Sequence, residues 1–236
     1  MSTDRPDRTE SPYTVPPGWF QIESDLATAG RIAGDDERLT ETALLTINAK
    51  YGVTHRIDLQ FVFNPWERVE ATQEGFPDQS DSGTGSAGLR AKFNLFGNDD
   101  GGIAFALLPF ATVPTRGDAI LDFITWGMVA PLAIPIGDAA ALTFMGGITS
   151  IDDEDWWGSV SGSFGTAIAG DFAGFVEFYL SRSSFDSDAI DDTTFDIGVT
   201  FAPGDNWQLD AGVYRGLATE TEDWRVFLGA SVRTPL

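Results

Sequence analysis

Residues 55–63 read His55-Arg56-Ile57-Asp58-Leu59-Gln60-Phe61-Val62-Phe63, with an apolar side chain at every second position from Ile57 onward. A β-strand has a side-chain period of two, so this stretch predicts a strand with one apolar face and one polar face. The same alternation returns in residues 194–201 and 223–232. Strands of about ten residues are long enough to cross a bilayer at a tilt.

Twelve stretches of this kind follow one another along the chain. We expect strands near residues 19–28, 39–50, 55–63, 85–96, 103–113, 120–133, 139–149, 157–168, 172–182, 194–202, 207–215 and 224–233. The chain has 26 glycines and 18 phenylalanines and no sustained helical period, which favours strands and turns over helices.

The connections between these strands alternate in a second way. One connection is short and rich in Gly, Asn and Asp, and the next is generally longer and acidic, so that the longer set holds 20 of the 36 Asp and Glu residues. Short turns at one end, longer loops at the other and an even strand count are typical of bacterial outer-membrane barrels. We therefore predict an all-β fold: a single 12-stranded antiparallel transmembrane β-barrel over residues 19–236.

Residues 1–18 form a polar segment that contains Pro6, Pro12, Pro16 and Pro17. Proline has no backbone donor for a sheet, so we expect an N-terminal arm or plug segment here instead of a strand. This start has no basic region followed by an apolar core, and the barrel interpretation therefore expects that an export signal has been removed.

Composition excludes several classes of protein. The net charge of −22 argues against a nucleic-acid partner, because phosphate binding needs a basic surface. With no Cys, the chain has no disulfides and no thiol chemistry. The two most apolar segments, 103–114 and 124–136, are both interrupted by proline, which argues against a transmembrane helix.

The arm Thr3-Asp4-Arg5-Pro6-Asp7-Arg8-Thr9-Glu10-Ser11-Pro12, continuing through Val15-Pro16-Pro17-Gly18 into Phe20-Gln21-Ile22-Glu23, resembles the start of an outer-membrane family. This family is labelled "putative meta-pathway of phenol degradation" and is often called a transporter. Weaker matches follow in Gly88-Leu89, Lys92-Phe93, Ala106-Leu107-Leu108-Pro109 and Val113-Pro114-Thr115. The resemblance implies a β-barrel that passes hydrophobic or aromatic compounds.

The chain departs from the pattern of that family at two places. The Pro-Thr-Gly motif of the family reads Pro114-Thr115-Arg116-Gly117 here. The chain ends in Pro235-Leu236, whereas outer-membrane barrels generally close with an aromatic residue.

Charged residues set the expected phase of each strand. A charged side chain at mid-bilayer depth on the lipid face costs roughly 2–4 kcal/mol, so charges should point into the barrel. The charged residues expected in the lumen are Glu23, Asp25, Arg56, Asp58, Arg90, Lys92, Asp122, Glu177, Asp196, Asp210, Arg225 and Arg233.

The same phase carries aromatic and apolar side chains inward. These are Trp126, Met128, Phe175, Tyr179, Tyr214 and Phe227. They predict a narrow passage with apolar patches, suited to a small hydrophobic or aromatic solute. The alternative is an interior filled by its own side chains or by the arm.

Tryptophans fall beside the predicted strand ends, where an indole can bury its ring and keep its N–H in water. The residues expected in such interfacial girdles are Trp19, Trp66, Trp156, Trp157, Trp207 and Trp224. A soluble β-sandwich whose strands merely begin with Trp is the alternative interpretation.

No motif singles out a catalytic or cofactor site. His55, the one histidine, lies beside a predicted short turn and has no evident nucleophile nearby, so we expect a solvated turn residue. The acidic residues Asp152, Asp153, Asp155, Asp186 and Asp188 are weak Ca²⁺ candidates, because the glycine and distal glutamate of an EF-hand loop are missing.

The sequence thus predicts a non-enzymatic, porin-like channel of a Gram-negative outer membrane, monomeric and without a cofactor. Its expected partners are membrane lipids, including outer-leaflet headgroups, and a small-molecule solute. Two alternatives stay open. One is a plugged structural or surface-binding barrel without transport, and the other is a lipid-modifying outer-membrane enzyme that uses His55.

Overall fold

The computed structural model describes residues 1–34, 37–98, 101–115, 124–150, 155–185, 188–218 and 221–236. The strands are β1 (Trp19–Ala33), β2 (Glu37–Thr54), β3 (Ile57–Phe63), β4 (Trp66–Gln73), β5 (Gln79–Gly83), β6 (Ser86–Phe96), β7 (Ala104–Pro114), β8 (Thr125–Ile136), β9 (Ala140–Ser150), β10 (Trp156–Ala169), β11 (Phe172–Phe185), β12 (Asp188–Phe201), β13 (Trp207–Gly216) and β14 (Trp224–Pro235). Among these described residues no helix meets the length and hydropathy that a membrane span requires.

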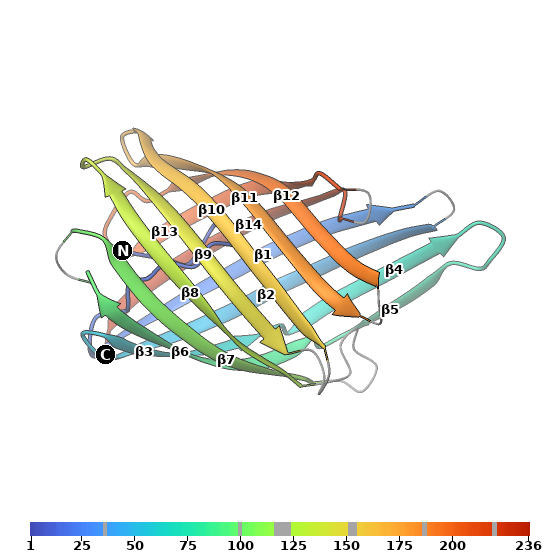
Figure 1. The fold of residues 1–236 in the computed structure, drawn as a ribbon, viewed down its shortest axis with the longest axis horizontal. Coiled ribbons are helices and arrows are strands. Elements are labelled where there is room, and N and C mark those ends of the chain that lie inside the picture. The colour runs from blue at the N-terminus through green and yellow to red at the C-terminus, as the bar shows by residue number, and fades with distance from the viewer. Residues whose placement is uncertain (35–36, 99–100, 116–123, 151–154, 186–187, 219–220) are drawn as a thin grey trace.

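Twelve of the strands close into one antiparallel barrel (Figure 1). Strand β1 pairs with β2 on one side and with β14 on the other, which joins the first strand to the last. The predicted fold class is therefore confirmed. The exception is the expected loop at 64–84, where β4 and β5 form a hairpin that pairs with the Glu37–Leu44 half of β2 and extends beyond the barrel wall.

The two ends of the barrel differ in their connections. One end, called the turn end below, carries both chain termini and the short links after β2, β6, β8, β10 and β12. Gly97, Gly137 and Gly170 lie in three of these links with φ of 82°, 61° and 56°, a backbone region that glycine enters without steric cost. The other end, called the loop end, carries the remaining connections.

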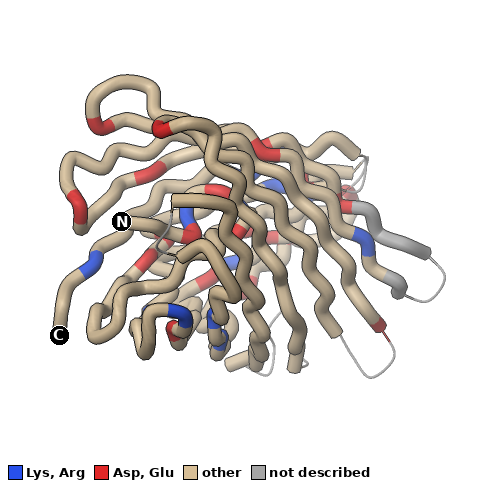
Figure 2. The backbone as a smooth tube through the Cα atoms, turned by 60° about the vertical axis from the view of Figure 1, so that its left-hand side comes forward, with Lys and Arg blue, Asp and Glu red and all other residues tan. Residues whose placement is uncertain are grey.

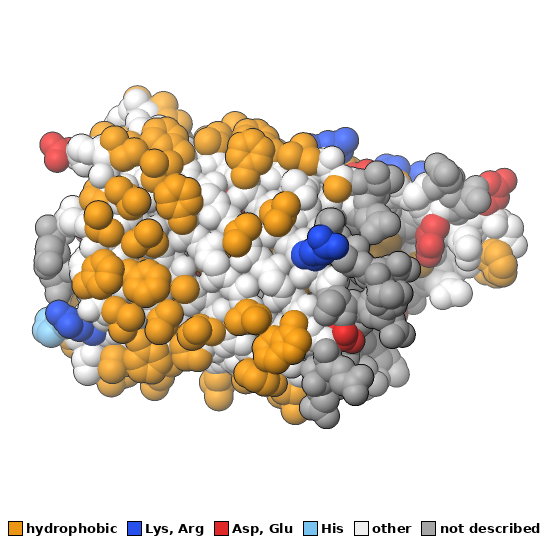
Figure 3. All heavy atoms as spheres, in the orientation of Figure 1, with side chains coloured by type: hydrophobic (Ala, Val, Ile, Leu, Met, Phe, Trp, Pro, Cys, Tyr) orange, Lys and Arg blue, Asp and Glu red, His pale blue; other side chains and the backbone are white. Residues whose placement is uncertain are grey.

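The outer face of the barrel is apolar. In β3, Leu59 and Phe61 are 53% and 46% exposed, while the alternating Asp58 and Gln60 are buried. Leu89 on β6, which pairs with Phe61, is also exposed. Figure 3 shows hydrophobic side chains spread over the visible face of the barrel wall, among other uncharged surface. An apolar exterior with a polar interior is the arrangement that a lipid environment requires.

The alternation changes phase once in the long strands β1 and β2. Up to Asp25 the odd-numbered residues of β1 face inward, and beyond the irregularity between Asp25 and Ala27 the even-numbered ones do. In β2 the change occurs at Leu45, whose φ is 58°. A bulge of this kind shifts every later side chain to the opposite face.

Aromatic rings gather near both ends on the outer face. At the turn end, the Phe201 ring lies 4.7 Å from that of Phe172 and 6.0 Å from that of Trp207. At the loop end, the rings of Trp126 and Trp156 lie 5.5 Å apart. Such rings favour the interface between hydrocarbon and headgroups.

Four of the six girdle candidates lie on the outer face of the sheet, namely Trp66, Trp156, Trp207 and Trp224. Trp19 and Trp157 differ from the expectation and point inward. The Arg233 guanidinium lies 5.2 Å from the Trp19 ring, and Trp157 lines an internal cavity. Both residues share the strand phase of inward polar neighbours, Gln21 in β1 and Ser159 in β10. A position at a strand end therefore does not decide which face a side chain occupies.

We expect Phe61→Arg to lower the free energy of unfolding by roughly 2–4 kcal/mol, because it places a charge on the lipid face. Denaturant unfolding in lipid vesicles, followed by Trp fluorescence, measures this change. Phe76→Arg is the matched control, since Phe76 is exposed between β4 and β5, away from the barrel wall. Equal effects of the two substitutions would contradict the assignment of the lipid face.

Candidate functional site: the barrel lumen

The N-terminal arm, residues 1–18, folds into the barrel. It enters from the turn end, contacts inward side chains of strands all around the wall and returns to the turn end where Gly18 precedes β1. Figure 2 shows acidic and basic positions close to the N-terminal segment, and several of these form ion pairs between the arm and the strands. The lumen is therefore a polar core built between the arm and the strands.

Asp4 is the centre of a buried charge cluster. Its carboxylate pairs with the ammonium groups of Lys50 on β2 and Lys92 on β6, the latter at 2.5 Å. Lys50 also pairs with Glu23 on β1 at 2.5 Å, and Glu23 accepts hydrogen bonds from the Asp4 backbone N–H and from the Gln21 amide. The cluster thereby ties the arm to three strands.

Two arginines of the arm reach the opposite part of the wall. The Arg5 guanidinium contacts Asp25 on β1 at 2.5 Å and Asp210 on β13 at 2.6 Å. The Arg8 guanidinium contacts Asp192 on β12 at 3.1 Å and lies 3.7 Å from Asp196.

The same two guanidiniums stack on aromatic rings of the wall. Arg8 lies 4.7 Å from the ring of Tyr179 and 4.8 Å from the ring of Tyr214, and Arg5 lies 5.5 Å from the ring of Phe227. Cations over aromatic faces are stabilised by the ring quadrupole. The arm therefore covers the aromatic part of the wall.

Backbone groups of the arm are held by side chains of the strands. Glu177 on β11 accepts the N–H groups of Arg8 and Thr9 at 3.1 and 2.9 Å. Near the turn end, Asp58 accepts the Val15 N–H at 3.0 Å, and Asn94 donates to the Pro12 carbonyl at 2.9 Å. Inward polar residues of the strands thus replace the water that an extended segment would otherwise need.

The arm is not a membrane-spanning segment, and its three acids, Asp4, Asp7 and Glu10, have perturbed pKa values. Burial raises the pKa of Asp7 to about 7, and the neighbouring Glu177 carboxylate adds to the rise. Burial acts in the same direction on Asp4, but Lys50 and Lys92 hold its pKa well below the ordinary value. Asp4 is therefore a fixed anion, whereas the charge of Asp7 changes near neutral pH.

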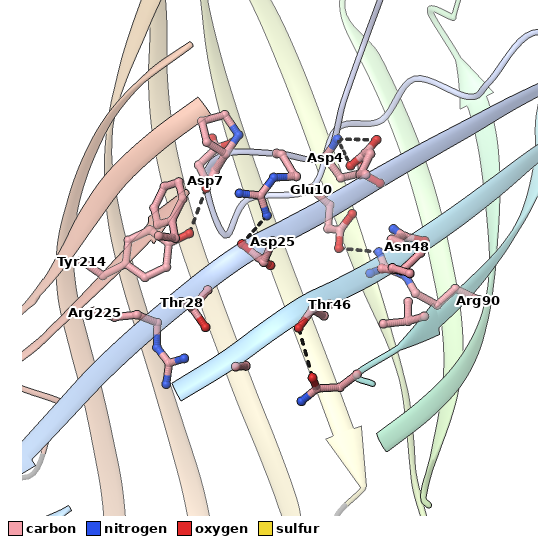
Figure 4. Close-up of a pocket in the computed structure, with 18 of the residues that line it drawn as sticks. Asp4, Asp7, Glu10, Asp25, Thr28, Thr46, Asn48, Arg90, Tyr214 and Arg225 are labelled. Atoms are coloured by element: carbon pink, nitrogen blue, oxygen red, sulfur yellow. Dashed lines mark hydrogen bonds and ion pairs between the residues drawn. The ribbon is translucent and has the colours of Figure 1, made fainter. Parts of the chain in front are cut away.

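The arm adjoins the cavity that Trp157 lines, to which Arg8 contributes, and two further cavities. The first of these two has a volume of about 360 Å³ and lies among the arm, β1, β2, β6, β13 and β14, where Asp7, Asp25, Arg90, Tyr214 and Arg225 surround it (Figure 4). The second has a volume of about 500 Å³, and it lies toward the turn end against β9, β10 and β11. Pro6 and Asp7 line both cavities.

The structure places most of the predicted lumen residues inside the barrel. Each of them contacts the arm, lines a cavity or lies on the same face of its strand as residues that do. These are the charged residues Glu23, Asp25, Asp58, Arg90, Lys92, Glu177, Asp196, Asp210, Arg225 and Arg233 and the aromatic residues Phe175, Tyr179, Tyr214 and Phe227.

Three predicted lumen residues lie elsewhere. Arg56 is exposed in the turn before β3. Trp126 and Met128 are 54% and 40% exposed on the outer face of β8, in phase with Ile136. Asp122, the charge that sets their expected phase, lies outside the described residues and precedes the first residue of β8, Thr125. A charge beyond the strand cannot fix the phase within it.

The residues that hold the arm were not predicted from the sequence. Asp4, Arg5, Arg8 and Glu10 had no expected role beyond the arm itself, and Lys50 was not assigned to the lumen. Lys50 follows Thr46 and Asn48 at every second position of β2, and this polar pattern indicates that the three side chains share the inward face. This signal is obscured by the change of phase at Leu45, because Glu41 faces inward on the other side of it.

The remaining candidates stand apart from the lumen. His55 is exposed in the turn after β2, where its backbone carbonyl accepts hydrogen bonds from Thr14 and Asn98. Asp152, Asp153 and Asp186 lie outside the described residues, Asp155 just precedes β10 and Asp188 begins β12. Within the described ranges, no three His, Cys, Asp or Glu residues are grouped to hold a metal ion.

A comparison with protein families matches residues 3–234 to the family described as "Putative MetA-pathway of phenol degradation". No curated protein matches the chain. Among solved structures, the COG4313 outer membrane channel from Pseudomonas putida F1 is similar, with a TM-score of 0.76, 17% identity and coverage of 94% of this chain and 97% of that one.

Two other solved barrels are less similar. The translocator domain of the autotransporter NalP from Neisseria meningitidis has a TM-score of 0.60 and 11% identity, over 93% of this chain and 90% of that one. The KdgM porin has a TM-score of 0.51 and 9% identity, over 90% of this chain and 98% of that one. At such identities these likenesses show a shared fold.

We expect Lys50→Met to destabilise the docked arm by about 3–5 kcal/mol, because it leaves Asp4 and Glu23 buried with less compensation. Hydrogen exchange of residues 2–16 and thermal unfolding in detergent measure the effect. Arg68→Met is the matched control. It breaks the Arg68–Glu70 pair at 2.6 Å, whose side chains are both 46% exposed, and an exposed pair contributes about 0–1 kcal/mol. Unchanged exchange in the Lys50 variant would show that the cluster does not hold the arm.

Proposed function

Because the chain belongs to the family described as "Putative MetA-pathway of phenol degradation", we propose that it is a channel of the bacterial outer membrane that passes small solutes by diffusion. The observation that carries this proposal is a closed barrel with an apolar exterior and cavities beside its internal arm. The name of the similar solved structure, an outer membrane channel, supports it.

The lumen supports passage better than a packed core would. A barrel interior that is only structural can be filled by its own apolar side chains. Here the wall carries buried Glu23, Lys50, Asp58 and Lys92, which are costly to bury and are satisfied by an arm that is not part of the sheet. A polar interior beside cavities suits water and small solutes.

The finer proposal concerns the solute. With the arm in place, the aromatic faces of Tyr179, Tyr214 and Phe227 are covered by guanidinium groups of the arm. Displacement of the arm would expose these rings to the lumen and give an apolar path along β11, β13 and β14. We propose that small hydrophobic or aromatic solutes pass in that state, and that the protein does no covalent chemistry on them.

A second candidate function is a plugged barrel that has a structural or surface-binding role. The observation in its favour is the number of strands that hold the arm, including β1, β2, β6, β11, β12 and β13. An arm held this firmly would close the lumen permanently.

We expect the full-length protein to conduct ions weakly in a planar bilayer and the variant without residues 2–16 to conduct several-fold better. The deletion removes the segment that divides the lumen, so the cavities merge. Heat-modifiable migration on a gel serves as the control that both proteins are folded. A full-length barrel that never conducts, beside a deletion variant that does, would favour the plugged barrel.

The solute proposal has its own readout. We expect the deletion to increase the flux of a neutral phenol into liposomes more than the flux of a sugar of similar size, because it uncovers the aromatic wall. Liposome swelling measures both rates. An equal increase for the two solutes would mean that the aromatic wall confers no preference.

A further inference from the structure

The charges of the barrel wall are unevenly distributed. The four consecutive strands β7, β8, β9 and β10 contain no Asp, Glu, Lys or Arg. All the inward charges of the described wall belong to the other strands, and Asp25, Lys50, Lys92 and Asp210 among them hold the arm by ion pairs. The arm is therefore tethered on one side of the lumen and faces a neutral wall on the other.

Contacts between the arm and this neutral wall involve no charged side chain of the wall. The Thr9 hydroxyl lies 2.6 Å from the Ser161 hydroxyl on β10, and the Glu10 backbone N–H points to the Met145 sulfur on β9 at 3.4 Å. The turn-end cavity opens on this side, lined by small residues that include Ala141, Ser163 and Gly165. None of the ion pairs found among the described residues crosses the turn-end cavity.

The lining of the two cavities is acidic. The only charged residues that line the turn-end cavity, among those described, are Asp7 and Asp138. The other cavity is lined by the acids Asp4, Asp7, Glu10, Glu23, Asp25 and Glu41 against the bases Arg5, Arg90 and Arg225. Both cavities therefore favour a positive charge over a negative one.

Asp7 occupies the partition between these cavities. Together with Pro6 it lines both of them, and its carboxylate is near the Ser163 hydroxyl of the neutral wall and the Glu177 carboxylate of β11. No ion pair of Asp7 is found among the described residues, unlike Asp4, Arg5, Arg8 and Glu10. Among the charged side chains of the arm, the Asp7 carboxylate is thus the one that remains available to a solute.

We infer that small cations, inorganic or amine-bearing, cross the lumen through these two cavities past Asp7 while the arm stays in place, and that Asp7 determines this cation selectivity. The inference rests on the proposed channel function. It adds a route, a residue and a charge preference for the state in which the arm is docked.

The test is the reversal potential of the full-length protein in a planar bilayer under a KCl gradient at pH 8. We expect the wild type to prefer K⁺ over Cl⁻ and Asp7→Asn to lower the permeability ratio by at least about threefold, since a unit charge about 7 Å from an ion in water changes its energy by about RT. Asp7→Lys should reverse the preference. Asp171→Asn is the matched control, because Asp171 is exposed in the turn between β10 and β11 and lines neither cavity.

A second measurement locates the route. The chain has no Cys, so Asp7→Cys provides a single thiol for charged thiosulfonate reagents. We expect the reagents to change the conductance when added from either side of the bilayer. Gel migration with and without heating verifies that each variant is folded.

The outcomes separate the inference from the proposed function. A wild type without conductance overturns both. A conducting wild type whose permeability ratio is the same in Asp7→Asn, or a thiol at position 7 that reagents reach from one side only, overturns the inference and leaves the channel standing.

Discussion

Hydrogen bonding of the backbone in hydrocarbon is the constraint on which the rest of this structure depends. Lipid offers no partners for N–H and C=O groups, so a sheet that spans a membrane must have no open edge. The pairing of β1 with β14 satisfies this requirement along most of both strands. Once the sheet closes, one face must be apolar and the other is free to be polar, and the alternation in every strand follows from that division.

The polar face then needs partners of its own. A lysine or glutamate buried without compensation costs several kcal/mol, and the strands alone leave Lys50, Lys92, Glu23 and Glu177 facing a narrow interior. The arm supplies carboxylates, guanidiniums and backbone donors at the positions where the wall needs them. Arm and wall therefore form one hydrogen-bonded core, and the neutral strands β7–β10 mark where that core ends.

Much of this fold could be predicted from the sequence because a period of two in side-chain polarity is a local signal. Residues 57–63 alone define a strand and its two faces, and the buried Asp58 and exposed Phe61 follow that pattern. The site was less predictable. The bulge at Leu45 inverts the phase of β2, and the partners of Arg5 lie 20 and 205 residues away in sequence. Neither a change of phase nor a distant ion pair leaves a periodic trace.

Arg5 contacts strands on both sides of the seam where β1 meets β14. Its guanidinium pairs with Asp25 on β1 and Asp210 on β13, and it fills the space above Gly229 on β14, where a Cβ atom would lie 2.0 Å from an Arg5 nitrogen. Contacts between residues so distant in sequence raise the contact order and cannot form until the chain between them is ordered. The first residues of the chain are thus among the last to reach their final positions, and the arm can settle only as the barrel becomes a closed cylinder.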